Sequence, residues 1–203
     1  MGSFRRSATR CFFPPPCGRD SVTPRVAPTL VETERLLLRM PVPDDAELIF
    51  TRYASDSSVT RYMSFRRHES IDDTRTFLDF SRMEWLANGC GPYLVLLRGS
   101  GLLLGGTGLS IQFDEAETGY VFARDAWGRG YATESLTAMV QVARGVGLHA
   151  LHARCHPEHR ASARVLEKCG FTLEQRVKSA LVFPNLSPER QDVLSYALTL
   201  GLP

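Results

Sequence analysis

The sequence lacks a long apolar run, since its apolar stretches, such as those at 94–97 and 102–104, have at most the length of single strands. A membrane-spanning helix needs roughly 18 such residues or more. The net charge of +2 is small and the basic residues are spread along the chain, whereas nucleic-acid binders usually gather them on one face. We therefore expect neither a membrane span nor a nucleic-acid partner.

Cysteine is scarce and irregularly placed, with five residues, an odd number, and no C-x-x-C pair. Reduced thiols in a cytoplasmic protein are the simplest interpretation of this pattern. Histidines gather around Cys155, but their spacing matches no standard zinc motif; they are His149, His152, His156 and His159. We predict no metal site.

The first 28 residues differ in composition from the rest of the chain. They hold five arginines but one acid, Asp20, and they contain the run Pro14-Pro15-Pro16. An Arg-rich, acid-poor opening is typical of an organelle transit peptide, but the proline run would interrupt its amphipathic helix. Of the two interpretations we favour an extension without a targeting role, followed by one domain over residues 29–203.

Hydrophobic periodicity and turn residues predict the element order β-α-α-β-β-β-α-β-α-β-β. Asp44 is expected to cap the first helix, with Glu47 three residues later. Hairpins join the early strands and a helix crossover follows Ala123, so we predict an α/β (α+β) fold with a mixed, mostly antiparallel central sheet flanked by helices. Strands are expected at 35–40, 93–97, 102–111, 118–123, 148–155, 177–183 and 193–200, and helices from 43 and at 71–86, 132–143 and 161–169.

A glycine-rich turn at residues 127–133 joins a predicted strand to a predicted helix. Gly128 and Gly130 let the backbone turn tightly, and the first turn of the helix leaves N–H groups uncovered beside a partial positive charge. Such a site suits a diphosphate, and Arg129 can add a full charge. The segment has no glycine at Thr133, as a dinucleotide fingerprint requires, and no Lys-Ser/Thr pair after Gly130, as a P-loop requires. A diphosphate ligand other than NAD or ATP is favoured, and coenzyme A qualifies.

Several stretches, taken together, resemble a known family. The segments 119–122 (GYVF) and 127–134 (WGRGYATE) look like the coenzyme A loop of the GNAT acetyltransferases. With tryptophan at 127, the loop is similar to that of the RimJ/RimL branch, which comprises the ribosomal-protein N-terminal acetyltransferases and their relatives. The stretches 33–39 (TERLLLR), 156–162 (HPEHRAS) and 164–171 (RVLEKCGF) agree with it. The resemblance covers roughly residues 30–200.

The resemblance implies an acetyl-CoA site at which main-chain N–H groups of residues 128–133 hold the diphosphate and the 118–123 strand pairs with the pantetheine arm. It also implies that this strand and the 151–155 strand splay apart, making a cleft for the thioester. The family often has Asn where His159 stands, and His caps a helix less well. The expected cofactor-binding residues are Val121, Phe122, Trp127, Gly128, Arg129, Gly130, Tyr131, Ala132, Thr133, His159 and Ser162.

Two residues are expected to carry the chemistry of amide formation. Glu117 is the predicted general base, because it alternates onto the same side as Gly119 and Val121; the alternative is an exposed turn acid. Leu166 stands where many family members have a tyrosine, so the resemblance points instead to Ser162 as the general acid. The alternative for Ser162 is a hydroxyl that bonds to the backbone. A backbone N–H near Val121 is the expected oxyanion donor.

The acceptor is expected to be an amine, either a protein N-terminus or a small molecule, with direct transfer and no covalent enzyme intermediate. Two other functions stay open, a non-catalytic coenzyme A sensor and a nucleotide-binding protein. A monomer and a homodimer are both compatible with the sequence. Related enzymes build the acceptor pocket in the region that holds Tyr53, Tyr62, Phe65, Arg66, Arg67 and Trp85 in this sequence. The alternative is that the aromatic residues belong to the core and that the two arginines are solvated.

Overall fold

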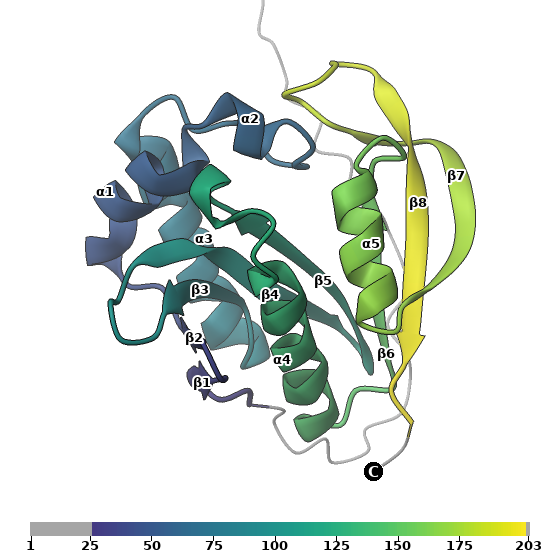
Figure 1. Ribbon diagram of the computed structural model, residues 1–203, viewed down its shortest axis with the longest axis horizontal. Coiled ribbons are helices and arrows are strands. Elements are labelled where there is room, and N and C mark those ends of the chain that lie inside the picture. Colours follow the sequence, from purple (N-terminus) through teal and green to yellow (C-terminus); the bar gives the residue numbers. More distant parts are fainter. Residues whose placement is uncertain (1–25, 202–203) are drawn as a thin grey trace, which may run out of the picture.

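A computed structural model describes residues 26–201, and in this part of the chain eight strands form one mixed sheet in the order β1-β2-β3-β4-β5-β6-β8-β7 (Figure 1). Neighbouring strands are antiparallel except at β5–β6, where the pairing is parallel. This agrees with the predicted α/β (α+β) class. The strands are β1 (Leu30–Glu32), β2 (Leu36–Arg39), β3 (Pro92–Leu97), β4 (Leu103–Gln112), β5 (Glu115–Phe122), β6 (Ala150–Cys155), β7 (Thr172–Val182) and β8 (Arg190–Thr199).

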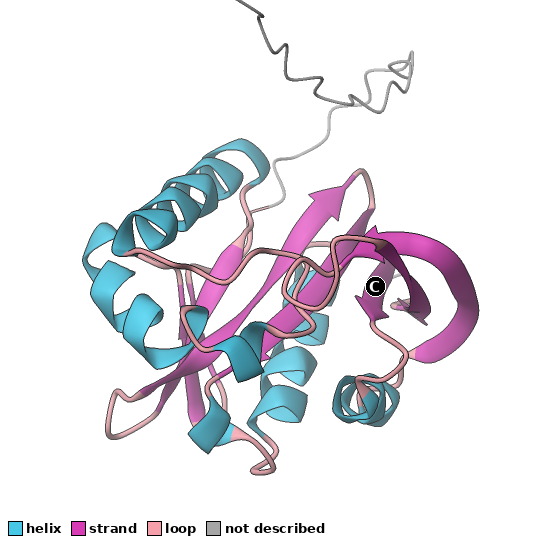
Figure 2. Cartoon of the chain, turned by 90° about the horizontal axis from the view of Figure 1, so that it is seen from above, coloured by secondary structure: helices cyan, strands magenta, loops and turns pink. Residues whose placement is uncertain are grey.

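Helices cover both faces of the sheet (Figure 2). One layer holds α1 (Ala46–Ile49), α2 (Ser57–Thr60) and α3 (Ile71–Asn88), together with the 3-10 helix η1 (Pro43–Asp45) and the π-helix η2 (Phe50–Ala54). The opposite layer holds α4 (Tyr131–Gly145) and α5 (Arg160–Lys168), with η3 (Arg124–Ala126) leading into α4. None of the described helices is long and apolar enough to cross a membrane.

The strands β5 and β6 diverge after a short paired stretch. Their register runs only from Glu115↔Ala150 to Glu117↔His152, although β5 continues to Phe122 and β6 to Cys155. The helix α4 makes the crossover between them and packs its apolar stripe, which includes Leu136 and Met139, on the sheet. The predicted splay is therefore confirmed, and it leaves two strand edges facing an opening.

The predicted helix boundaries hold where capping residues mark them. Ser70 and Asp73 form a capping box at the start of α3, and Gly89 ends this helix in the left-handed conformation expected after a helix. The predicted cap at Asp44 is wrong: the carboxylate of the next residue, Asp45, accepts from the Val42 N–H at 2.8 Å. Asp45 also pairs with Arg39, which fixes its side chain there instead.

Several strand boundaries differ from the predicted ones. Strand β5 begins at Glu115 rather than at 118, so Glu117 lies inside the strand and not at its opening. The acidic stretch 114–117 read as a turn, but pairing with both neighbours extends the strand through it. Strand β7 begins at Thr172, earlier than predicted, while β1 and α2 were not predicted at all because each is too short to show a period.

The predicted extension over residues 1–28 lies mostly outside the described residues. Within the described part, contacts with the domain begin at Ala27, which is buried and donates its N–H to the Gly89 carbonyl. The Pro28 carbonyl accepts from the Tyr93 hydroxyl at 2.6 Å. Packing therefore starts two residues before the predicted domain boundary.

Candidate active site

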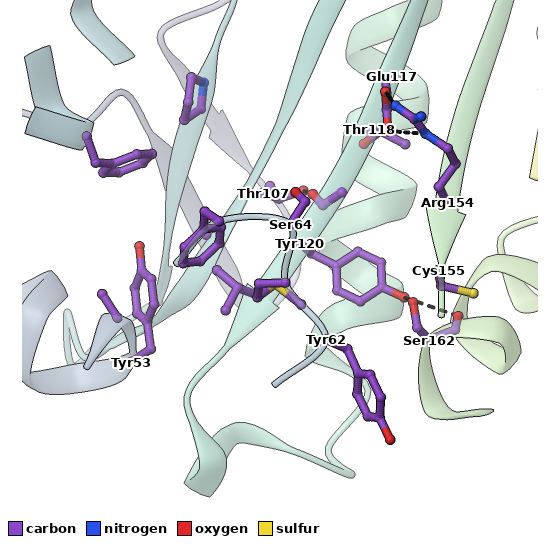
Figure 3. A pocket seen from close by; sticks show the side chains of 18 of the residues that line it. Tyr53, Tyr62, Ser64, Thr107, Glu117, Thr118, Tyr120, Arg154, Cys155 and Ser162 are labelled. Atoms are coloured by element: carbon purple, nitrogen blue, oxygen red, sulfur yellow. Dashed lines mark hydrogen bonds and ion pairs between the residues drawn. The ribbon is translucent and has the colours of Figure 1, made fainter. Parts of the chain in front are cut away.

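A cavity of about 620 Å³ occupies the place where β5 and β6 diverge (Figure 3). Residues 117–121 of β5 line one side of it, and residues 153–155 of β6 line the other. His159 and Ser162, from the start of α5, complete this end. Four of the predicted site residues, Glu117, Val121, His159 and Ser162, thus meet in one cavity.

Glu117 faces β6 across the first step of the splay. Its carboxylate accepts two hydrogen bonds from the Arg154 guanidinium, of which the one from Nε measures 2.9 Å (Figure 3). The bond to Glu117 raises the pKa of Arg154. Arg154 lies beyond His152, the last residue of β6 paired with β5, so this ion pair bridges the diverging strands. The alternative of a merely solvated turn acid does not describe Glu117, although its partner Arg154 was not foreseen.

Ser162 shares a hydrogen bond with a tyrosine that sequence reasoning missed. The hydroxyl of Tyr120 lies 3.0 Å from Ser162 Oγ and 3.2 Å from the Ser162 carbonyl oxygen (Figure 3). Burial raises the pKa of Tyr120, so its phenol stays protonated and can donate. Tyr120 belongs to the GYVF stretch, but the strand alternation placed it on the face opposite Glu117. The cavity spans the strand edge and therefore takes side chains from both faces.

The free edge of β5 offers main-chain groups to a ligand. Ala123 donates to the Leu104 carbonyl on β4, while the Phe122 carbonyl accepts from Trp127 Nε1 at 2.7 Å. Main-chain groups of an antiparallel strand face a given neighbour at every second residue. The N–H of Val121 therefore points to β4, and those of Tyr120 and Phe122 point to the opening. The oxyanion donor expected near Val121 therefore corresponds to the N–H group of Tyr120 or of Phe122.

The glycine-rich loop lies at the far end of β5 from Glu117 and does not line the cavity. Gly128 and Gly130 have φ values of 72° and 81°, in the left-handed region that favours glycine. Within the described residues, no acceptor takes the main-chain N–H groups of residues 128–133. A Cβ at Gly128 would meet no atom within 4 Å. Six free donors beside open space at a helix start fit a diphosphate.

A clamp from the turn between β1 and β2 holds this loop. The Glu134 carboxylate accepts from Thr33 Oγ1 at 2.6 Å, from the Arg35 N–H at 2.8 Å and from Arg35 Nε at 2.7 Å. Arg35 also donates to the Arg129 carbonyl at 3.0 Å and stacks its guanidinium over the Tyr131 ring. The TERLLLR and WGRGYATE stretches were noted separately in the sequence. In the structure the two stretches are in contact, and the TERLLLR stretch holds the WGRGYATE stretch in place.

Aromatic stacking surrounds the start of α5. The Tyr62 ring stacks on His159, with centroids 4.9 Å apart, and on His156 at 5.1 Å. His159 makes no side-chain cap to α5, and burial lowers its pKa. His149 and His152 lie instead near acids of the β4–β5 hairpin. Among the described residues, no group of three or more His, Cys, Asp or Glu side chains could hold a metal ion.

The other half of the cavity has an aromatic wall. Of the residues expected in an acceptor pocket, Tyr53, Tyr62, Phe65 and Arg66 line it. Trp85 does not: it is buried in the core and donates its indole N–H to the Pro92 carbonyl. The cavity thus joins a polar end, at the diverging strands, to an apolar end under the first helical layer.

Comparisons with known proteins agree with this arrangement. An acetyltransferase (GNAT) domain model matches residues 35–172. The uncharacterized N-acetyltransferase YoaA of Bacillus subtilis is 29% identical over 171 residues, which are 82% of this chain and 95% of YoaA.

Among solved structures, a GNAT-family acetyltransferase from Bacillus anthracis is 30% identical, with a TM-score of 0.73, covering 84% of this chain and 98% of that one. A RimL ribosomal L7/L12 alpha-N-protein acetyltransferase in complex with coenzyme A has the same fold, with a TM-score of 0.74 at 19% identity, over 86% of this chain and 98% of that one.

The free N–H groups at the start of α4 and the splayed strands are what a coenzyme A thioester requires, and the domain match spans more than half of the chain. The chain therefore belongs to the GNAT family and is an acetyl-CoA-dependent N-acetyltransferase.

Proposed function

We propose that this enzyme transfers the acetyl group directly to a primary amine, with Glu117 as the base and Ser162 as the acid. The observation that carries this proposal is the single cavity in which these two side chains lie on either side of the free edge of β5. Holding an amine beside a thioester at this edge would remove several kcal/mol of the barrier by orientation alone.

Glu117 is placed to take the proton of the amine. Each carboxylate oxygen has more than one lone pair, so an oxygen bound to Arg154 can still accept from an amine or from an intervening water. Arg154 fixes the rotamer of Glu117 and would offset the change of charge when the proton arrives. An α-amine, with a pKa of about 7.7–8.0, demands less of this base than lysine, at about 10.4.

Ser162 is placed to protonate the sulfur as it leaves. When its hydroxyl gives up a proton, the neighbouring Tyr120 hydroxyl can donate to the serine oxygen and stabilise the negative charge. Acetyl-CoA supplies the activated acyl group, and the N–H groups of Tyr120 and Phe122 are the donors available to its carbonyl and pantetheine amides.

The remaining cofactor contacts follow the loop. Main-chain N–H groups of Gly128, Arg129, Gly130, Tyr131, Ala132 and Thr133 would hold the diphosphate. Trp127 fixes the turn through Phe122, and His159 borders the thioester end. The loop and the cavity lie at opposite ends of β5, so one extended carrier can reach both.

The state of the cysteines supports direct transfer. Cys155 lines the cavity, but burial raises its pKa to about 11, so almost none of it is thiolate at neutral pH. The described cysteines Cys90, Cys155 and Cys169 are free thiols.

A thiol-release assay with acetyl-CoA and a panel of amines tests the proposal. Glu117→Gln and Ser162→Ala should each lower kcat while leaving the Kd for acetyl-CoA unchanged. Glu115→Gln is the matched control, because Glu115 lies two residues away on the same strand and pairs with His152 outside the cavity. Unchanged turnover in both Glu117→Gln and Ser162→Ala would contradict the proposed roles of base and acid.

A further inference from the structure

The acceptor end of the cavity is lined by aromatic rings from four separate segments. They are Tyr53 of η2, Tyr62 and Phe65 of the 61–70 loop, Phe77 and Phe80 of α3, and Phe183 after β7. Such a wall suits a flat, apolar ligand, since aromatic pairs gain contact energy beyond their buried area.

One polar group is aimed into this apolar end without a partner. Tyr53 is only 4% exposed, and its hydroxyl makes no hydrogen bond within the described residues. Burial raises its pKa, so the phenol is neutral. Figure 3 shows Tyr53 across the cavity from Glu117 and Ser162. The hydroxyl oxygen is accessible from the cavity, so a ligand with a polar group at its far end can form a hydrogen bond with it.

The charges that line the cavity are unfavourable for an acceptor with several amines. Among residues 26–201, only two carboxylates line it, and both are engaged. Glu117 pairs with Arg154, and Asp73 accepts the N–H groups of Glu69 and Ser70, both at 2.9 Å. Arg66, in contrast, has no ion pair among the described residues. A second ammonium group would therefore meet a free cation and no free anion.

The loop over the cavity is tied down at both ends, which limits the size of the acceptor. The Asn185 amide donates to the Thr60 and Phe65 carbonyls, both at 2.8 Å, and accepts from the Arg67 N–H at 2.7 Å. Tyr62 is held by its stacking on His156 and His159. The volume of about 620 Å³ must also admit the thioester end. The remaining space is sufficient for a small molecule.

We infer that the acceptor is a compact monoamine carrying an aromatic ring with a polar substituent at its far end, an inference that rests on the proposed amine acetylation. The amine lies between Glu117 and Ser162, the ring packs among the aromatic side chains, and the substituent bonds to the Tyr53 hydroxyl.

The test is a comparison of kcat/KM in the thiol-release assay for tyramine, phenethylamine, spermidine and an N-terminal serine peptide. Tyramine should exceed spermidine and the peptide at least tenfold, and should exceed phenethylamine several-fold. Spermidine or the peptide as the best acceptor would overturn the inference and leave amine acetylation standing. Failure of every amine would overturn both.

Variants at two positions, Tyr53 and Phe80, locate the acceptor. Tyr53→Phe keeps the ring, so it should leave the Kd for acetyl-CoA unchanged and bring the tyramine-to-phenethylamine ratio to about one. Phe80→Ala should raise the KM for tyramine several-fold, and Phe80→Glu should shift the preference toward spermidine. Met83→Ala is the matched control, because Met83 lies on the same helix, is 56% exposed like Phe80, and does not line the cavity. An unchanged ratio in Tyr53→Phe, or equal effects of the Phe80 and Met83 variants, would place the acceptor elsewhere.

Discussion

The two ends of strand β5 are built in different ways. At the end near Phe122 the groups proposed to bind the ligand are the free main-chain N–H groups of residues 128–133, in a loop held by one clamp from Thr33 and Arg35. At the end near Glu117 they are side chains from the 61–70 loop, α3, β6 and α5. The first end depends on local backbone conformation, and the second on how distant segments meet.

This difference predicts different consequences of mutation. A side-chain change at the loop alters few ligand contacts, whereas a change of φ there alters several N–H directions at once. At the acceptor end each side chain contributes separately, so single substitutions should change specificity by modest factors and leave acetyl-CoA binding intact.

The largest effect is expected from Gly128→Val. Gly128 and Gly147 have φ values of 72° and 73°, and neither would bring a Cβ within 4 Å of another atom. The left-handed conformation costs an L-residue about 1–2 kcal/mol, so both valine variants should lose similar stability. Only Gly128→Val should lose acetyl-CoA affinity, by at least tenfold, in a calorimetric titration. Equal affinities in the two variants would mean that the loop N–H groups do not hold the diphosphate.

The clamp around Glu134 should contribute a part of the free energy of unfolding that is lost at low pH. Burial opposes ionisation of Glu134, but hydrogen bonds from Thr33 and Arg35 outweigh it and lower its pKa below the ordinary 4.5. Because the folded pKa is the lower one, the ionised clamp stabilises the fold fully above the unfolded pKa and is lost as pH falls through the folded value.

Glu134→Gln should therefore cost about 1–3 kcal/mol at pH 7, and its free energy of unfolding should converge with that of the wild type on acidification. Denaturant unfolding at several pH values measures this. The control is Glu174→Gln, at an exposed position of β7. If the free energies of unfolding of the wild type and of Glu134→Gln change with pH in parallel, the clamp is not the source of the acid-dependent stability.

A smaller effect is expected at Asn185, whose side chain holds the 61–70 loop over the cavity. Asn185→Ala removes three hydrogen bonds, and Asn185→Asp keeps the acceptor for the Arg67 N–H but loses both donors. Each should raise the KM for the amine about three- to tenfold, the range that one net hydrogen bond gives, with Ala the stronger. The KM for acetyl-CoA should stay constant; a parallel rise in both constants would contradict a role confined to the acceptor end.

The smallest effect is expected from Tyr120→Phe, which removes the hydroxyl that contacts Oγ and the carbonyl oxygen of Ser162. We expect kcat to fall about two- to tenfold, as for one net hydrogen bond. Tyr196→Phe is the matched control, since its buried hydroxyl bonds to Glu167 at 3.2 Å outside the cavity. A larger loss than in Ser162→Ala would make Tyr120 the acid itself.

The sequence predicted the elements that have their own periodicity or end signals. The hairpin of β3 and β4, the helices α3, α4 and α5 and the parallel step from β5 to β6 were all predicted, because apolar spacing and turn residues act locally. The start of β5 was wrong because the acids at 114–117 look like a turn until β4 and β6 pair with them.

The candidate site divides in the same way. Glu117 and Ser162 were singled out in advance, but Arg154 and Tyr120, their hydrogen-bond partners, were not. Arg154 lies 37 residues from Glu117 in the chain, and Tyr120 lies 42 residues from Ser162. No spacing rule joins residues so far apart. Asn185 was missed as the residue that holds the 61–70 loop for the same reason, whereas Tyr53 was expected in the acceptor pocket and does line the cavity.

The sequence alone determined the helix-start loop, its glycines and the order of the elements, since main-chain conformation follows from neighbouring residues. The tertiary structure decided which side chains surround the cavity, which carboxylates are already paired, and which hydroxyl is left without a partner. Those properties depend on distances between segments that only the packing of the sheet and its two helical layers sets.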